Sequence, residues 1–141
     1  PRLTNFKVFC AGPWLDRDQM QAIATKLLEA GHTITSRWVF EHPDLSPDNP
    51  EYLGLVREQA MQDIEDIVKS QVVVYLNSRM SEGKATELGM AMMLGLPILV
   101  IGKPVNNIYL KLLPETFETA EQVIEMMATD DREDAGDGLA N

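Results

Sequence analysis

Two apolar runs separated by a helical segment constrain the fold of this chain most strongly. Residues 72–76 (VVVYL) carry no charge and show no alternation, which is typical of a strand buried on both faces of a sheet. Residues 82–94 then have helical spacing that ends at Gly95, and a second apolar run follows at 96–101 (LPILVI). This order predicts two parallel strands joined by a helix.

The rest of the chain continues the alternation of strands and helices. Residues 6–11 (FKVFCA) predict a first strand, and the alternating residues 32–38 predict a second. Helices are expected from Asp16 to Gly31, with Leu28 on the apolar face, and over 51–70, with Leu55, Ala60, Ile64 and Ile67 toward the core. Weaker patterns indicate a short helix at 106–113, an edge strand at 116–118 and a last helix at 119–128. We therefore expect an α/β fold: a flavodoxin-like or Rossmann-like three-layer sandwich with a mostly parallel sheet of four to five strands.

The charge distribution divides the chain into one domain, residues 1–128, and an acidic tail, residues 129–141, expected to be disordered. The net charge is −10, and the tail holds five acids and one arginine, so −4 belongs to it. Nucleic-acid polymers require basic patches, so they are not expected as partners. Small molecules remain compatible with an acidic body.

Cofactor, metal and membrane signals are weak throughout the sequence. The first loop lacks the three-glycine dinucleotide fingerprint, and His32 and His42 are not spaced as metal ligands, so we predict no cofactor and no metal. No apolar run approaches the roughly 20 residues of a membrane helix. With a single cysteine, Cys10, nothing requires an oxidising compartment, and the cytoplasm is the expected location.

Two acidic residues lie at positions where they could take part in catalysis. Glu87 lies about one turn into the helix that follows a small-residue loop, beyond the strand at 72–76. Ligands of open α/β sheets bind at that edge. Asp63 lies near the middle of the 51–70 helix, beside apolar residues, and a pair of acids in different environments can separate their pKa values. The alternative for each is an ordinary solvated helix side chain.

The loop after the first strand, Cys10-Ala11-Gly12-Pro13-Trp14, is a second candidate for ligand contact. Its small residues allow the backbone to approach a ligand, and Trp14 could stack on a nucleobase. A plain tight turn with a packing tryptophan is the alternative.

These pieces together resemble the nucleoside 2-deoxyribosyltransferase family, which also includes the 2′-deoxynucleoside 5′-monophosphate N-glycosidases. The resemblance covers about residues 6–128. Its anchors are Phe9-Cys10-Ala11-Gly12, Asp63 nine residues before Val72, the pattern Ser81-x-Gly83-x-Ala85-Thr86-Glu87-Leu88-Gly89, and Gly102-Lys103-Pro104-Val105-Asn106.

The resemblance implies roles for individual residues. Glu87 would be the nucleophile that attacks C1′ of a 2-deoxyribosyl group, and Asp63 would be the acid for the leaving base. The loop residues Cys10, Ala11, Gly12 and Trp14, with Ser81 and Gly83, would hold the substrate, and Asn106 would reach a neighbouring subunit's site. The family thus implies a homo-oligomer, a dimer or higher, with shared active sites. Many members have a tyrosine near the end of the first strand, where Val8 is the closest residue here.

The function expected from the resemblance is transfer of 2-deoxyribose between nucleobases through a covalent glutamyl-deoxyribosyl intermediate. The main alternative is a 2′-deoxynucleoside 5′-monophosphate N-glycosidase, a hydrolase. Ser81 resembles the serine near the 5′-phosphate in those glycosidases, whereas Trp14 resembles the transferase loop, so the need for a 5′-phosphate stays open. A non-catalytic nucleotide-binding module is a further alternative, because a fold does not fix a function, and an oligomer-forming structural protein is another.

Overall fold

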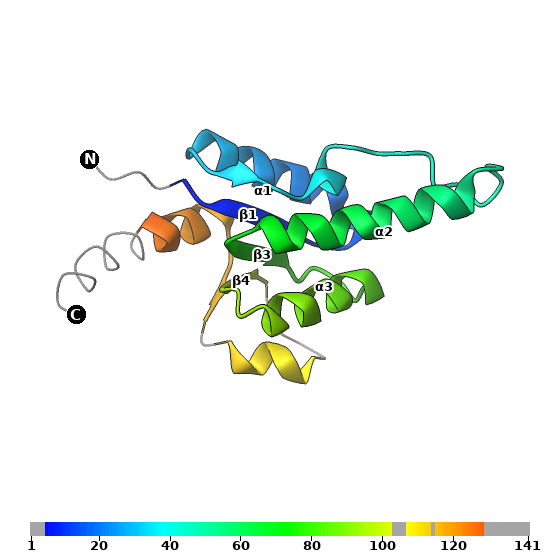
Figure 1. Ribbon diagram of the computed structural model, residues 1–141. Helices are drawn as coiled ribbons and strands as arrows, with labels where there is room; N and C mark the ends of the chain where they lie inside the picture. The colour runs from blue at the N-terminus through cyan, green and yellow to red at the C-terminus, as the bar shows by residue number, and fades with distance from the viewer. Residues whose placement is uncertain (1–4, 103–106, 114, 129–141) are drawn as a thin grey trace.

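Five strands lie parallel in one sheet with the order β2-β1-β3-β4-β5 in the computed structural model, which describes residues 5–102, 107–113 and 115–128 (Figure 1). This is the flavodoxin-like order of doubly wound sheets. The fold class and the parallel sheet predicted from the sequence are confirmed. The strands are β1 (Lys7–Ala11), β2 (Thr33–Ile34), β3 (Val72–Leu76), β4 (Ile98–Ile101) and β5 (Thr116–Phe117).

The direction of winding changes between β1 and β3, which pair from Val8 opposite Val72 to Ala11 opposite Tyr75. From β1 the chain crosses to β2 on one side, and from β3 it crosses to β4 on the other. The carboxyl ends of β1 and β3 therefore lie side by side with their loops diverging, which is where doubly wound folds form ligand clefts.

Helices cover both faces of the sheet (Figure 1). Helices α2 (Tyr52–Lys69) and α3 (Glu82–Met93) contact each other on one face. Helix α1 (Arg17–Glu29) lies on the other face, where Lys26 Nζ reaches Glu121 Oε1 of the helical residues 120–128 at 2.6 Å. Short 3₁₀ helices complete the described chain: η1 (Trp14–Asp16), η2 (Arg37–Val39) and η3 (Ile108–Leu112).

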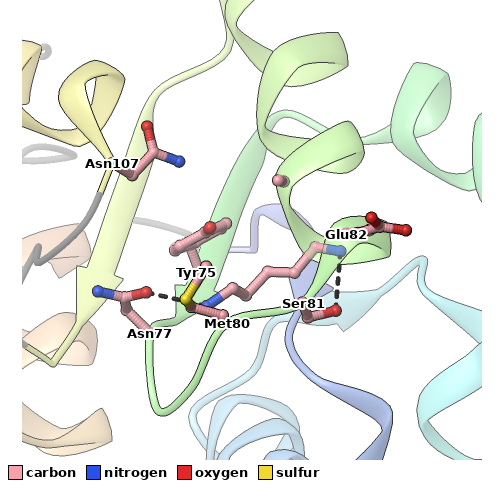
Figure 2. A pocket seen from close by; sticks show the side chains of 8 residues that line it. Tyr75, Asn77, Met80, Ser81, Glu82 and Asn107 are labelled. Carbon is pink, nitrogen blue, oxygen red and sulfur yellow. Dashed lines mark hydrogen bonds between the residues drawn. The ribbon is translucent and has the colours of Figure 1, made fainter.

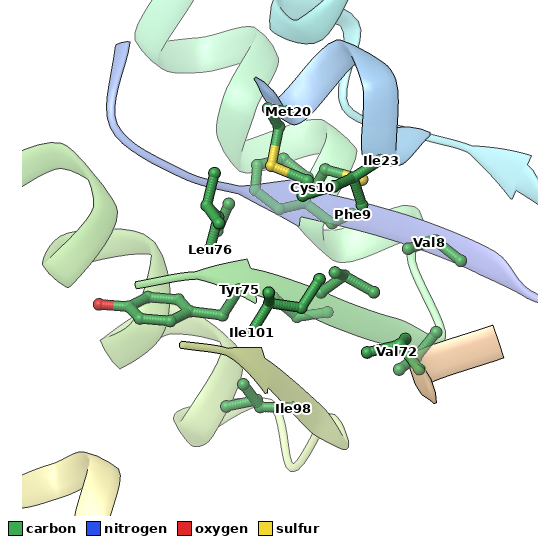
Figure 3. Packing of buried hydrophobic residues seen from close by; sticks show 14 of the residues in the cluster. Val8, Phe9, Cys10, Met20, Ile23, Val72, Tyr75, Leu76, Ile98 and Ile101 are labelled. Atoms are coloured by element: carbon green, nitrogen blue, oxygen red, sulfur yellow. The ribbon is translucent and has the colours of Figure 1, made fainter. Parts of the chain in front are cut away.

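The two central strands are buried along most of their length, as Figure 3 shows. Every residue of β3 is buried, and in β1 only Lys7 at the start is exposed. Burial on both faces explains the apolar run at 72–76, because no position of this strand meets water. The largest buried side chains, including Phe9, Met20 and Tyr75, fill the space between the sheet and its helices.

Strand β2 is shorter than the predicted 32–38, because residues 36–38 form hydrogen bonds with groups that are distant in the sequence. The backbone N–H of Cys10 donates to Ser36 Oγ at 3.0 Å, and Trp38 Nε1 donates to the Cys10 carbonyl at 2.8 Å. The Arg37 N–H and guanidinium both donate to the buried carboxylate of Asp66. These bonds turn residues 37–39 into a 3₁₀ helix.

Two further predictions need correction, one about the core-facing residues of the helices and one about a helix cap. Ala60 and Ile64 of α2 are exposed, as is Leu28 of α1, whereas Asp66 is buried through its bonds to Arg37. Asp16 precedes α1 as predicted, but its carboxylate makes no capping bond there and instead accepts hydrogen bonds from Ser78 and Arg79. The predicted Asn106 and the acidic tail at 129–141 lie outside the described residues.

Candidate active site

A cleft of about 160 Å³ opens at the carboxyl ends of β1 and β3, between the loops that leave these strands and helices α2 and α3. It occupies the switch point where the sheet topology predicts a ligand. The residues that line it are Gly12, Trp14, Trp38, Leu45, Gln59, Asp63, Ser81, Gly83, Lys84 and Glu87.

Two carboxyl groups face this cleft from different helices, Asp63 from α2 and Glu87 from α3. Burial raises the pKa of Asp63 to about 6. Burial, and secondly the charge of Asp63, raises the pKa of Glu87 well above its ordinary value. The pair therefore holds a proton at pH values where exposed carboxyl groups are ionised, which is the condition for one acid and one base in the same site.

The carboxyl group of Asp63 has a fixed neighbour one turn earlier in α2. Gln59 Nε2 donates a hydrogen bond to Asp63 Oδ1 at 3.2 Å, and this bond opposes the rise in the pKa of Asp63 because it favours the carboxylate. The charge of the buried Asp66 raises the same pKa, and Arg37 lowers it. Groups of α2 and η2 thus set both the orientation and the pKa of the Asp63 carboxyl group.

Aromatic side chains form one wall of the cleft. The rings of Trp14 and Trp38 lie 6.3 Å apart, and His42 meets the Trp14 ring edge-on at 5.5 Å. The Arg17 guanidinium lies 4.7 Å from the centre of the Trp14 ring. Trp14 keeps 41% of its surface exposed, so part of its ring is available to a flat ligand.

The floor of the cleft comes from the first turn of α3. Ser81 is the N-cap of this helix, and its Oγ accepts from the Lys84 N–H at 3.3 Å. Gly83 also lines the cleft, and a Cβ there would meet only Ser81 Oγ at 4.0 Å, so the missing side chain leaves space for a ligand.

Lys84 joins this cleft to a neighbouring cavity of about 300 Å³, shown in Figure 2. The lysine is buried, and its Nζ donates to Asn77 Oδ1 at 2.9 Å and to the Arg79 carbonyl at 2.6 Å. It also lies 4.9 Å from the centre of the Tyr75 ring. Burial lowers the pKa of Lys84. These contacts hold the loop between β3 and α3, and with it the start of the helix that carries Glu87.

The same loop is tied to the other side of the cleft. Arg79 Nε donates to Asp16 Oδ2 at 2.8 Å, and Ser78 Oγ bonds to the same carboxylate. Gly12 belongs to this junction, because a Cβ there would lie 3.2 Å from Met20 Sδ and 3.4 Å from Leu76 Cβ. The two loops that leave β1 and β3 are therefore packed against each other and joined by hydrogen bonds.

The cleft brings together most of the residues selected from the sequence: Gly12, Trp14, Asp63, Ser81, Gly83 and Glu87. Cys10 and Ala11 are fully buried in β1 and lie beneath the cleft, where the Cys10 carbonyl holds Trp38. Asn106 is outside the described residues, although Asn107 beside it lines the neighbouring cavity.

Four cleft residues were not predicted from the sequence: Trp38, Leu45, Gln59 and Lys84. The alternating pattern predicts Trp38 as the last residue of the strand at 32–38, and nothing in the pattern distinguishes Gln59 from other polar helix residues. The position of Trp38 at the end of a predicted strand is a signal that could have found it, because ligands of open α/β sheets bind beyond strand ends.

Two negative findings apply to the part of the chain that the structure describes. It contains no group of three or more histidine, cysteine or acidic side chains placed to hold a metal ion. Within the same residues, no helix is both long enough and apolar enough to cross a membrane.

No protein-family model matches this sequence, and no curated protein matches it. Solved structures do match. A 2-deoxyribosyltransferase from Bacillus psychrosaccharolyticus superposes with a TM-score of 0.60 at 23% identity, over 84% of this chain and 90% of that one. A conserved protein from Enterococcus faecalis gives 0.59 at 15% identity, over 89% and 99%. The CMP N-glycosidase of Clostridium botulinum gives 0.53 at 14% identity, over 87% and 98%. At these identities the likeness establishes the fold, and this chain has the fold of the 2-deoxyribosyltransferase along nearly its whole described length.

Proposed function

We propose that this protein is an enzyme of the nucleoside 2-deoxyribosyltransferase type, which cleaves an N-glycosidic bond and moves the 2-deoxyribosyl group from one nucleobase to another. The observation that carries the proposal is the pair Asp63 and Glu87, two carboxyl groups of raised pKa in one cleft with an aromatic wall. A flat base can stack on that wall while the two acids reach the sugar–base bond. The named activities of the 2-deoxyribosyltransferase and the CMP N-glycosidase that share the fold agree with this chemistry.

In the first step, the ionised carboxylate of Glu87 attacks C1′ of the nucleoside. The bond between C1′ and the base nitrogen breaks, its electron pair goes to the base, and the base takes a proton from Asp63. A covalent ester between Glu87 and the deoxyribosyl group results. This two-step logic is the one that retaining glycosidases use.

In the second step, an acceptor base attacks C1′ and gives its proton to the Asp63 carboxylate. The ester bond breaks, and Glu87 leaves as a carboxylate. Attack by water instead of a base would give free 2-deoxyribose, so transfer and hydrolysis share every residue of the site and differ in the access of water to the intermediate. No cofactor is needed for either route.

The first test is a chromatographic assay of the purified protein with each deoxynucleoside and each 5′-monophosphate, with and without a second base. We expect a new nucleoside to form when both a donor nucleoside and an acceptor base are present. Free deoxyribose or its 5-phosphate as the sole product, despite excess base, would favour the hydrolase. Binding without turnover of any substrate would favour a non-catalytic nucleotide-binding module.

We also propose that the protein forms a dimer through α2. Leu53, Met61, Ile64 and Val68 of this helix are between 44% and 63% exposed and follow one another at helical spacing. Such a stripe is unusual on a monomer surface. About a centre between Ala60 and Met61, Leu53 mirrors Val68 and Ala60 mirrors Met61, whereas Ile64 mirrors Arg57. An antiparallel pair of copies would therefore match apolar positions at the centre and at both ends of the stripe across a twofold axis.

Arg57 lies within the stripe, and in this pairing its side chain would pack beside Ile64 of the other copy and reach toward Glu65, which also pairs with Arg37 of its own chain at 3.2 Å. We expect Met61→Glu to convert a dimer to a monomer, measured by light scattering after size-exclusion chromatography. Leu28→Glu, at an apolar and 45% exposed position on the opposite face of the sheet, is the matched control and should leave the mass unchanged. A monomeric parent protein would contradict the proposal. A role for Asn106 in the partner's site stays a prediction.

A further inference from the structure

The bond between Gln59 and Asp63 places two hydrogen-bonding groups next to each other in the cleft. Both side chains line the cleft together with Trp14 and Trp38, and they lie one turn apart on the same face of α2. Gln59 also lines the adjoining cavity formed by residues 41–43 and α2. It is thus a side chain at the boundary of the cleft, beside the proposed acid.

The bond to Asp63 fixes which group Gln59 can offer to a ligand. A carboxylate only accepts hydrogen bonds, so the Gln59 amide must turn its Nε2 hydrogen toward Asp63 Oδ1. The amide is planar, so its carbonyl oxygen then lies on the far side from that bond. When Asp63 carries its proton on Oδ2, the pair presents a donor from Asp63 and an acceptor from Gln59.

We propose that Gln59 makes the enzyme selective for nucleobases that carry an amino group beside a ring nitrogen. This inference rests on the proposed function, in which Asp63 protonates the leaving base. Adenine presents the N7 acceptor beside the N6 amino donor, and cytosine presents N3 beside its N4 amino group. Each edge complements a donor from Asp63 and an acceptor from Gln59. In hypoxanthine, the oxo counterpart of adenine, a carbonyl oxygen replaces the amino group beside N7. In uracil a carbonyl oxygen likewise replaces the amino group of cytosine, and N3 also carries a hydrogen.

An oxo base would set its carbonyl oxygen against the Gln59 carbonyl, which gives repulsion in place of a hydrogen bond. Turning the Gln59 amide over would relieve that contact, but it would direct the Gln59 oxygen at Asp63 Oδ1 and break the existing bond. The selectivity thus has two sources. The Gln59 carbonyl accepts a hydrogen bond from an amino base, and because its amide is held by Asp63, the same carbonyl repels the carbonyl oxygen of an oxo base.

The test compares deoxyadenosine with deoxyinosine, which share the N7 acceptor and differ along this edge only in the group at C6. We expect the parent protein to favour the amino base in kcat/KM by about 10- to 100-fold, which is the discrimination that hydrogen bonds to one base edge usually provide. In Gln59→Met, which keeps the length of the side chain without its polar atoms, the ratio should fall to about 1 to 3. Gln62→Met is the matched control on the same helix, because Gln62 bonds to Glu58 and does not line the cleft, and it should keep the parent ratio.

A second readout is independent of turnover. The chain has two tryptophans, and both line the cleft, so their fluorescence reports the binding of free bases. Tighter binding of adenine than of hypoxanthine in the parent, lost in Gln59→Met, supports the inference. Turnover with equal rates for amino and oxo bases, or a preference that survives in Gln59→Met, overturns it while the proposed function stands. Absence of turnover with every substrate counts against the proposed function, and the fluorescence ratio then decides the inference on binding alone.

Discussion

Replacing Glu87 by glutamine should lower turnover by at least about 10⁴-fold, because a neutral amide cannot form the ester on which the proposed two-step route depends. The side chain keeps its size and its place on α3, so the cleft should keep its shape. Burial raises the pKa of Glu87, so the ionised carboxylate costs stability as the pH rises toward that pKa, and glutamine removes this cost. We therefore expect the melting temperature of Glu87→Gln at alkaline pH to equal or exceed that of the parent.

The matched control is Glu82→Gln, an exposed acid in the first turn of the same helix, which should keep turnover within about threefold of the parent. Rapid quenching of the parent protein with substrate, followed by mass spectrometry, should find a deoxyribosyl adduct. Peptide mapping should place that adduct on Glu87. An adduct on Asp63 would reverse the roles of the two acids, and full turnover in Glu87→Gln would exclude Glu87 as the nucleophile.

The parts of the fold that depend on local pattern were predictable. Every position of strand β3 is buried, so its uninterrupted apolar run identifies it from the sequence. The same holds for α3, whose bounds follow from Ser81 as the N-cap and Gly95, with a φ of 70°, just beyond its end. From these two elements the position of Glu87 at the edge of the sheet follows directly.

Which face of α2 packs against the core could not be predicted. The helical spacing of apolar residues shows that a stripe exists, but it does not show what that stripe contacts. Ile64 and Ile67 both fit a helical pattern, yet Ile67 is buried and Ile64 is 44% exposed. The side chain that points inward beside Ile67 is Asp66, which spacing alone would place in water. It is buried because Arg37, 29 residues earlier, donates to it from backbone and side chain.

The lining of the cleft shows the same limit. Trp38 reaches the cleft because its indole N–H finds the Cys10 carbonyl, and Gln59 matters because Asp63 is one turn away on a helix that faces the cleft. Each contact joins segments whose proximity exists only in the folded chain. The acids could be selected by residue type, but the side chains that orient them could not.

Replacing Asp63 by asparagine should lower kcat/KM for natural nucleosides by about 10²- to 10⁴-fold, the usual contribution of a general acid. In the parent, the rate should fall on both sides of an optimum. The route needs one proton on the pair, so it fails at low pH, where both acids are protonated, and at high pH, where Glu87 and Asp63, whose pKa is raised to about 6, are both ionised. Asparagine does not titrate, so the alkaline limb should disappear. The remaining acid limb should follow the ionisation of Glu87 alone, whose pKa is no longer raised by the charge of Asp63.

A substrate whose leaving group needs no proton separates this role from a structural one. 4-Nitrophenyl 2-deoxyriboside releases 4-nitrophenolate as an anion, so Asp63→Asn should turn it over within about fivefold of the parent rate while Glu87→Gln still fails. An equal loss on both substrates would instead mean that Asp63 acts through the placement of the sugar or of Glu87. Since Gln59 binds the same carboxyl group, Gln59→Met should retain the bell-shaped profile, with the limb that Asp63 controls displaced to higher pH, because the bond that favours the carboxylate of Asp63 is gone. The direction of that displacement follows from the hydrogen bond alone, and it ties base recognition and proton transfer to one side-chain pair.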